Sequence, residues 1–208
     1  VGMCIDGGGD DEYSCGIYAL GGGYWSGIGI CADKGGNDRY TSAHYTLAAP
    51  PHYALGIFQD DAGDDVYYGY LRQAIGHGRD FSLGWFEDSA GDDFYQGGNM
   101  SIGTGNIQSI GVVWDKGGDD TYLLYGVGLG QTWTDSMGSI RDFIPTIGLF
   151  IDGGGRDRYL EIPTNIERVF DGDVNTLSPL AFAGDGKTWK RGDNLNAPYA
   201  KSVGIDAG

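Results

Sequence analysis

The chain has few of the residues that define several common protein classes. Only 13 of its 208 residues are Lys or Arg against 29 Asp or Glu, which leaves a formal net charge of −16, so we expect no nucleic-acid partner. Three cysteines form no even disulfide framework, which argues against a cysteine-stapled miniprotein. No apolar run approaches the roughly 20 residues that cross a bilayer, so no membrane span is expected. Only four of the acids are Glu, which argues against a helical bundle.

Glycine and aromatic residues are abundant instead. The sequence has 40 Gly and 14 Tyr, and 40% of it is hydrophobic. That composition is too apolar for a disordered chain, and it lacks the Gly-X-Y period of collagen. It predicts a folded protein with many tight turns.

One motif recurs through the first three quarters of the chain. It is DxGGxDxY, with Ala in place of the first Gly in two copies, and successive copies start 27, 27, 28, 27 and 37 residues apart. The leading Asp column consists of Asp6, Asp33, Asp60, Asp88, Asp115 and Asp152. The second Asp column, five residues later, consists of Asp11, Asp38, Asp65, Asp93, Asp120 and Asp157. The Tyr column, two residues further on, consists of Tyr13, Tyr40, Tyr67, Tyr95, Tyr122 and Tyr159.

Each copy is typical of a strand, a tight turn and a second strand. Aliphatic residues stand five before the leading Asp, as at Ile28, and apolar residues follow two places later, as at Ile30. This spacing of two predicts a strand whose apolar row faces inward. A Gly lies four before every leading Asp, and we expect it there because a side chain would collide with its copies in neighbouring repeats. Beyond the Tyr, a further glycine-rich stretch predicts a third short strand or a corner.

A period near 27 without helical segments predicts an all-β fold, a parallel β-solenoid with six recognisable coils in residues 1–159. Antiparallel hairpins stacked as a sandwich are the alternative. About ten extra residues interrupt the repeat around 130–145, and residues 160–208 form an irregular extension that leads into a partial seventh coil at Ser202-Val203-Gly204. Because the motif pattern is open at both ends of the chain, we expect end-to-end self-association.

Stacked coils would bring the aspartates of each column close together. Neighbouring carboxylates about 4.8 Å apart repel by about 0.9 kcal/mol even in bulk water. Backbone amides, exposure to salt water or bound cations could each offset this repulsion. Calcium binds six to eight oxygen ligands in flexible geometry, so all twelve aspartates of the two columns are candidate calcium ligands. The alternative is that they only cap turns, because Asp before Gly commonly accepts backbone amides.

The text of the motif resembles a known family. Gly35-Gly36-Asn37-Asp38-Arg39-Tyr40 and Ala90-Gly91-Asp92-Asp93-Phe94-Tyr95 resemble half of the glycine- and aspartate-rich nonapeptide of RTX proteins. Those proteins are secreted bacterial β-rolls that bind calcium between turns, although their repeat returns every nine residues. Residues 1–159 are also similar to uncharacterised bacterial and archaeal surface proteins with tandem GxGxLxDxxGDDxY repeats. The resemblance implies a secreted or cell-surface structural protein.

Two classes of function remain open at this point. The first is a non-enzymatic extracellular module with a structural, adhesive or fibre-forming role. The second is a glycan-binding module, or a polysaccharide lyase or hydrolase in which Trp133 and Trp189 frame acids such as Asp135 or Asp142. We expect the first, because acids that recur in every coil are typical of a scaffold and no nucleophile–base pair stands apart from the repeat.

Two other columns carry expectations. The Tyr column could present sugar-stacking faces, but we expect an aromatic ladder that packs the solenoid while its hydroxyls reach water. Cys4 and Cys31 occupy equivalent positions, and we expect small core residues there rather than a disulfide bridge.

Overall fold

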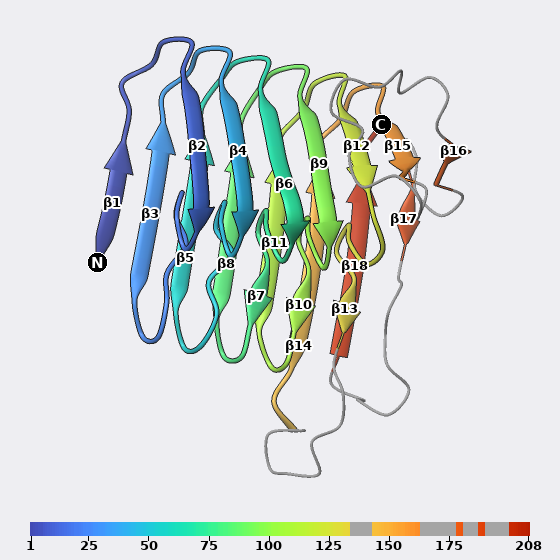
Figure 1. Cartoon of the computed structure of the whole chain (residues 1–208). Coiled ribbons are helices and arrows are strands. Elements are labelled where there is room, and N and C mark those ends of the chain that lie inside the picture. The colour runs from blue at the N-terminus through green and yellow to red at the C-terminus, as the bar shows by residue number, and fades with distance from the viewer. Residues whose placement is uncertain (134–142, 163–177, 181–186, 190–199) are drawn as a thin grey trace.

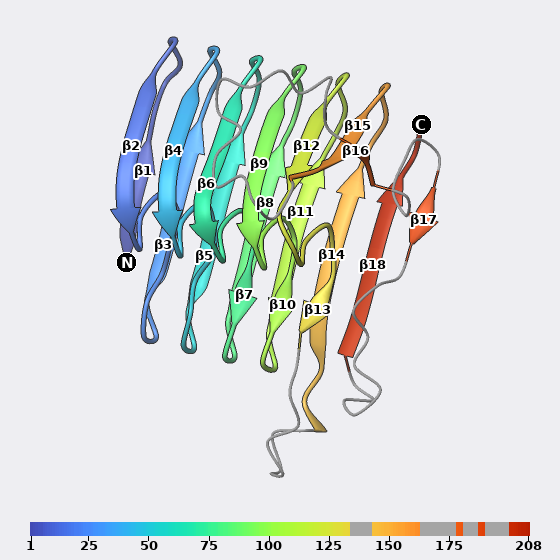
Figure 2. The ribbon, with the colours of Figure 1, turned by 45° about the vertical axis from the view of Figure 1, so that its right-hand side comes forward.

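A computed structural model describes residues 1–133, 143–162, 178–180, 187–189 and 200–208. The chain forms a parallel β-solenoid in which each coil contributes one strand to a first sheet and one to a second sheet, joined by the DxGGxD turn (Figure 1). Three of the coils add a short strand to a third sheet, and the coils are stacked side by side along one axis (Figure 2). The predicted fold class is therefore confirmed.

The three sheets contain all the strands of the described residues. In spatial order, the first sheet consists of β1 (Gly2–Ile5), β3 (Ile28–Asp33), β5 (Leu55–Asp60), β8 (Leu83–Asp88), β11 (Ile110–Asp115), β14 (Thr146–Asp152), β18 (Ala200–Asp206) and β17 (Thr188–Trp189). The second consists of β16 (Ser178–Pro179), β15 (Arg158–Glu161), β12 (Thr121–Leu124), β9 (Phe94–Asn99), β6 (Val66–Arg72), β4 (Arg39–His44) and β2 (Glu12–Ile17). The third consists of β13 (Thr132–Trp133), β10 (Gly105–Asn106) and β7 (Gly78–Arg79).

The strands pair in the register that the repeat predicts. Gly2 lies opposite Gly29, and Asp33 lies opposite Asp60, so each coil stacks on the copy one repeat earlier. Asp115 and Asp152 keep this register although 37 residues separate them. The hairpin sandwich is excluded for these strands because neighbouring coils pair in parallel. Only β16 and β17, at the C-terminal end, pair in the antiparallel direction among the described strands.

The extra residues of the longest repeat fall mostly at 134–142, and much of the C-terminal extension falls at 163–177, 181–186 and 190–199. These parts of the predicted insertion and extension lie outside the described residues.

The inward face of the first sheet differs from the prediction. In β5 the buried residues are Gly56, Phe58 and Asp60, whereas Leu55 and Ile57 are half-buried and face outward. The spacing of two is correct, but the prediction of which row faces inward is wrong. The inward row contains a glycine and an aspartate, so hydrophobicity alone assigned the core to the wrong face. Phe58 and Phe86 stack with centroids 4.8 Å apart in this inward row.

Two glycine columns are crowded for different reasons. Each coil has a third side, the glycine-rich stretch that follows its second-sheet strand. The glycine four before the leading Asp faces the backbone of this third side, and a Cβ on Gly29 would meet the carbonyl of Gly22. The predicted collision with stacked copies instead occurs at the glycine three after the leading Asp, where a Cβ on Gly63 would overlap the carbonyl of Gly36. Gly63 also has a φ of 143°, a conformation that residues other than glycine rarely adopt.

The corners of the coils place bulky residues in the left-handed region. Ile75 has a φ of 55° and Ile102 a φ of 60°, and Leu47 and Leu129 occupy equivalent corners with φ of 54° and 51°. Such conformations are costly for side chains with a Cβ, and especially for β-branched ones. All four side chains are fully buried, so core packing holds these corners in place.

A seventh strand continues the first sheet, as the repeat predicted. Its register differs from the sequence alignment, because Ser202 rather than Gly204 lies opposite Gly148. Asp206 therefore lies opposite Asp152 and extends the leading Asp column. Among the described residues, no helix has the length and apolar character needed to cross a bilayer.

Candidate metal site between the coils

The leading Asp side chains are held in the interior by two kinds of donor. Each Oδ1 accepts the backbone N–H two residues further on, at 2.8–3.4 Å, as a turn-capping Asp does. The Oδ2 accepts a Tyr hydroxyl: Tyr40 donates to Asp60 of the next coil at 2.7 Å, and Tyr95 donates to Asp115 at 2.7 Å. Asp60, Asp88, Asp115 and Asp152 are fully buried, which excludes exposure to salt water as the way in which their repulsion is offset.

The second Asp column forms a ladder of its own. The Oδ1 of Asp38 accepts the backbone N–H of Asp11 in the preceding coil, and this bond recurs along the column at 2.6–2.8 Å. These N–H groups lie in the tight turns, so the carboxylates satisfy amides that no strand partner satisfies. Backbone amides, one of the three ways considered for offsetting the repulsion, therefore bind the carboxylates of both columns.

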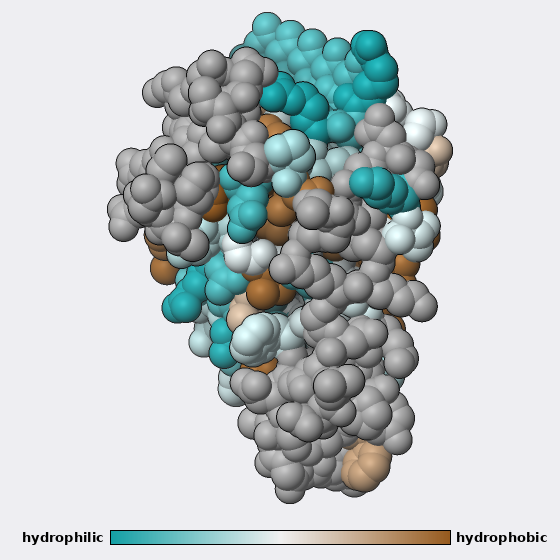
Figure 3. Space-filling model, turned by 90° about the vertical axis from the view of Figure 1, so that its right-hand side faces the viewer, coloured by the Kyte–Doolittle hydropathy of each residue, from teal (hydrophilic) through white to brown (hydrophobic). Residues whose placement is uncertain are grey.

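The residues just before the second Asp form a third ladder on the outer rim. Here each backbone N–H donates to a side chain of the preceding coil, whereas in the second Asp column it donates to the following coil. Asn37 donates its backbone N–H to Asp10, and Asp64 donates its own to Asn37, at 2.9 and 2.8 Å. Each turn is thus tied to the coil before it and to the coil after it. The rim formed by these turns is hydrophilic (Figure 3).

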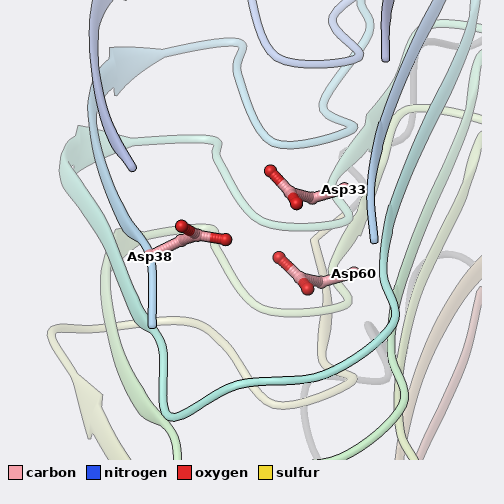
Figure 4. Close-up of side chains that lie close together, drawn as sticks. All are labelled: Asp33, Asp38 and Asp60. Carbon is pink, nitrogen blue, oxygen red and sulfur yellow. The ribbon is translucent and has the colours of Figure 1, made fainter. Parts of the chain in front are cut away.

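Carboxylates from the two inner columns converge in four clusters. Asp33, Asp38 and Asp60 form the first, and their side chains point toward a common space between two coils (Figure 4). In each cluster, one oxygen from each of three acids lies within 4.8 Å of the others. The other three clusters are Asp65 with Asp88 and Asp93, Asp93 with Asp115 and Asp120, and Asp120 with Asp152 and Asp157. Asp93 and Asp120 each belong to two clusters, so these three form a continuous file along the solenoid.

Two of these acids have an oxygen that no hydrogen bond satisfies. The Oδ2 atoms of Asp93 and Asp120 are buried and have no hydrogen-bond partner. The two residues are only 2% and 0% exposed. Buried polar atoms are nearly always satisfied, and an unpaired buried carboxylate oxygen is costly. The clusters of buried Asp can therefore bind a metal ion.

Crowding and burial change the acidity of these groups. Burial raises the pKa of Asp93 to about 11, and the neighbouring charge of Asp88 raises it as well. Burial and the charge of Asp115 raise the pKa of Asp120 to about 9 and that of Asp88 to about 8. These carboxyls therefore keep their protons at a higher pH than an ordinary Asp does.

The Tyr column is a stacked ladder, as predicted. Neighbouring rings are 4.7–5.2 Å apart and within 4–21° of parallel. The expectation that the hydroxyls reach water is wrong, because they donate to the leading Asp column in the interior. The four central tyrosines are fully buried, so they cannot present faces to a sugar.

The structure brings together ten of the twelve predicted ligands. Asp6 and Asp11, in the first coil, belong to no cluster among the described residues and are half-buried. Sequence analysis missed Asp206, which accepts the hydroxyl of Tyr159 at 3.0 Å. The sequence feature that could have revealed Asp206 is Gly208, two residues later. Asp206 accepts the N–H of Gly208, just as each leading Asp accepts the N–H two residues after it.

The remaining residues singled out from the sequence lie outside the Asp clusters. Cys4 and Cys31 pair in register without a disulfide bridge, and Cys31 is a buried core residue as expected. Cys4 is exposed, so the expectation of a core residue is wrong there. Trp133 is 48% exposed. Only the backbone of Trp189 is described, and Asp135 and Asp142 lie outside the described residues. Exposed aromatic side chains gather at the corners of the first and second coils, where Trp25 lies against Tyr53 beside a groove of about 590 Å³.

Fold and site together define an acidic parallel β-solenoid with an interior column of carboxylates and phenols. Searches against protein-family models, curated proteins and solved structures found no match. The argument for function therefore depends on the geometry of this column.

Proposed function

We propose that this chain is a non-enzymatic, extracellular structural β-solenoid module that is stabilised by calcium bound between its coils. The observation that carries the proposal is the pair of unsatisfied buried Oδ2 atoms on Asp93 and Asp120, the two acids that each belong to two carboxylate clusters. A divalent cation there would satisfy both oxygens and neutralise the repulsion within the clusters.

The donor set favours calcium over other cations. Every ligand atom in the four clusters is a carboxylate oxygen, which suits a hard cation. Calcium tolerates irregular arrangements of oxygens, whereas magnesium requires a near-ideal octahedron and retains its waters. The resemblance to RTX proteins supports the same ion and a secreted or cell-surface location.

A structural role is favoured over catalysis by the burial of the acids. A catalytic carboxyl must reach a substrate, but the leading Asp side chains of the central coils are buried and bonded to phenols and amides. The same arrangement recurs from coil to coil, which is what a scaffold requires. A glycan-binding module, the alternative class of function, stays a prediction from sequence.

The test compares two adjacent aspartates of one turn. Asp93→Asn removes a cluster ligand, whereas Asp92→Asn changes an exposed residue that only accepts the backbone N–H of Asp119. After dialysis against a chelator, calcium should raise the melting temperature of the wild type and of Asp92→Asn. It should raise that of Asp93→Asn much less, and bound calcium measured by elemental analysis should fall with it.

Protons are the competing occupant of the clusters. If they alone neutralise the column, calcium will not change the melting temperature of the wild type at pH 7.5. In that case Asp93→Asn, which mimics a neutral acid, will be more stable than the wild type without any metal. That pair of results would refute the calcium proposal.

A further inference from the structure

The first sheet is apolar on both of its faces. Before its leading Asp, β11 reads Ile-Gly-Val-Val-Trp, and β14 reads Ile-Gly-Leu-Phe-Ile before its own. Near-continuous apolar strands of this kind are typical of parallel sheets that are covered on both sides. The inward face is covered by the core of the solenoid, so the composition of these strands predicts a cover for the outward face as well.

We call the outward side of β3, β5, β8, β11 and β14 the apolar face. Two neighbouring rows of large apolar side chains cross it, and all of these except Val112 are partly exposed. The row at the start of the strands is Ile28, Leu55, Leu83, Ile110 and Ile147. The row two residues later is Ile30, Ile57, Trp85, Val112 and Leu149. A contiguous exposed apolar patch of this extent marks an interaction surface.

A groove continues the apolar face at the corner where each coil enters its first-sheet strand. It has a volume of about 590 Å³, and Leu55, Leu83 and Ile110 contribute to its lining. Tyr53 and Phe81 also line it, with their ring centroids stacked 5.0 Å apart. The groove therefore extends the apolar surface beyond the flat part of the sheet.

The charged side chains of the apolar face cancel one another. They lie at the opposite border, beside the DxGGxD turns, where Lys34 pairs with Asp61 at 2.7 Å and Lys116 pairs with Glu87 at 2.6 Å. Lys116 also lies over the ring of Trp114, 5.2 Å from its centroid. The whole chain carries a net charge of −16, but two Lys and two acids leave this face neutral. A second copy can therefore approach this face without meeting an excess of negative charge.

The outward side of the second sheet has a different character. Its row just before the Tyr column mixes charged, polar and apolar residues, namely Glu12, Arg39, Val66, Phe94, Thr121 and Arg158. Within the described strands, two unbroken apolar rows are thus found on the outward side of the first sheet and not on that of the second.

The area of the apolar face is that of a weak protein interface. Its five strands are at least six residues long. At about 4.8 Å between strands and about 3.3 Å per residue, they give about 500 Å² on each copy. Two such faces in contact bury on the order of 1,000 Å², the lower limit for a specific pair. Trp85 lies at the centre with Trp114 beside it, 6.3 Å between ring centroids, and aromatic side chains are enriched in interface cores.

We propose that two copies of this chain pair through the apolar face, sheet against sheet, so that two solenoids lie side by side. The pairing is isologous, because each copy buries the same two apolar rows and keeps its paired Lys and acids at the rim. It goes beyond the proposed function, since it involves neither the buried Asp columns nor a metal.

The test replaces two aliphatic residues of one coil by the same charged residue. Ile57→Lys places an ammonium in the middle of the apolar face, whereas Val66→Lys places one on the outward side of the second sheet. Both residues are half-buried, and both variants change the net charge equally. Sedimentation equilibrium over a range of concentrations gives the dissociation constant of the dimer, and circular dichroism checks that each variant is folded.

Hydroxyl-radical footprinting of the wild type locates the contact without any substitution. Trp85 and Trp114 should be modified more slowly at concentrations where dimers predominate than where monomers do. Tyr125, which is 38% exposed and follows the second-sheet strand β12, should react equally in both.

The wild type and Val66→Lys should form dimers with similar dissociation constants, and that of Ile57→Lys should be at least tenfold higher. A wild type that is monomeric at every concentration would overturn the proposal, even if it binds lipid vesicles or another protein through this face. A dimer that Ile57→Lys leaves intact, or whose footprint protects Tyr125 rather than Trp85, would overturn it too.

Discussion

Tyr67 donates its hydroxyl to Asp88 of the next coil and also lies 3.0 Å from Asp65 of its own turn. One fully buried phenol thus joins the two Asp columns across the interior of the solenoid. The tyrosine at the end of the repeated motif is therefore part of the carboxylate column and not a separate aromatic feature.

Removal of this hydroxyl should destabilise the protein. Tyr67→Phe leaves the buried carboxylate of Asp88 without its phenol donor, so we expect a loss of about 1–3 kcal/mol in the free energy of unfolding. Urea denaturation measures it. Tyr53→Phe is the matched control, because Tyr53 is 55% exposed, and it should change stability by less than about 0.5 kcal/mol. Equal effects of the two changes would contradict the proposed bond.

The two ends of one glycine column should respond differently to alanine. Gly111→Ala places a Cβ against the carbonyl of Thr104, so the third side of the coil must move. We expect a loss of about 1–3 kcal/mol, as for other overpacked sites. Gly2→Ala should cost little in the same chain because its Cβ enters open space. Thermal unfolding of both variants measures the difference, and a similar loss for both would refute the packing explanation.

In the presence of a chelator, the free energy of unfolding should fall as the pH rises. The folded protein raises the pKa of Asp60 to about 6, of Asp65 to about 7 and of Asp88 to about 8, mainly through burial. A raised pKa means that the folded state binds more protons than the unfolded state, so each group lowers stability as the pH increases from about 4 to its folded pKa, by up to about 1.4 kcal/mol per pH unit.

Melting temperatures between pH 4.5 and 8.5 test this dependence. Calcium, if it binds as proposed, should flatten the decline by stabilising the ionised form. A melting temperature that rises with pH in the chelator would show that the column is not strained by its charges.

The three thiols should react in a fixed order. Cys4 is exposed, Cys15 is half-buried and Cys31 is buried, and burial raises the pKa of Cys15 to about 11. Burial also raises the pKa of Cys31 well above its usual range. A thiolate is the reactive species, so alkylation should modify Cys4 first, then Cys15, and Cys31 only on unfolding. Early modification of Cys31 would show that the first two coils open readily.

The repeat by itself determined the stacking of the coils. Because equivalent residues recur every 27 or 28 positions, parallel pairing in register brings each Asp, Gly and Tyr over its copy, and this is how Asp33 comes to lie opposite Asp60. The same period identified twelve aspartates as candidate ligands, and ten of them converge in clusters.

Only the tertiary structure decided what these columns face. Both rows of a first-sheet strand contain apolar residues, so the pattern could not show that Phe58 and Asp60 point inward while Ile57 points outward. The partner of Tyr40 is Asp60, twenty residues later, because the two sheets of adjacent coils meet across the interior. Similarly, Gly29 is a glycine because of the third side of its neighbouring coil. Contacts across the interior depend on how the coil closes, and a one-dimensional period carries no information about that closure.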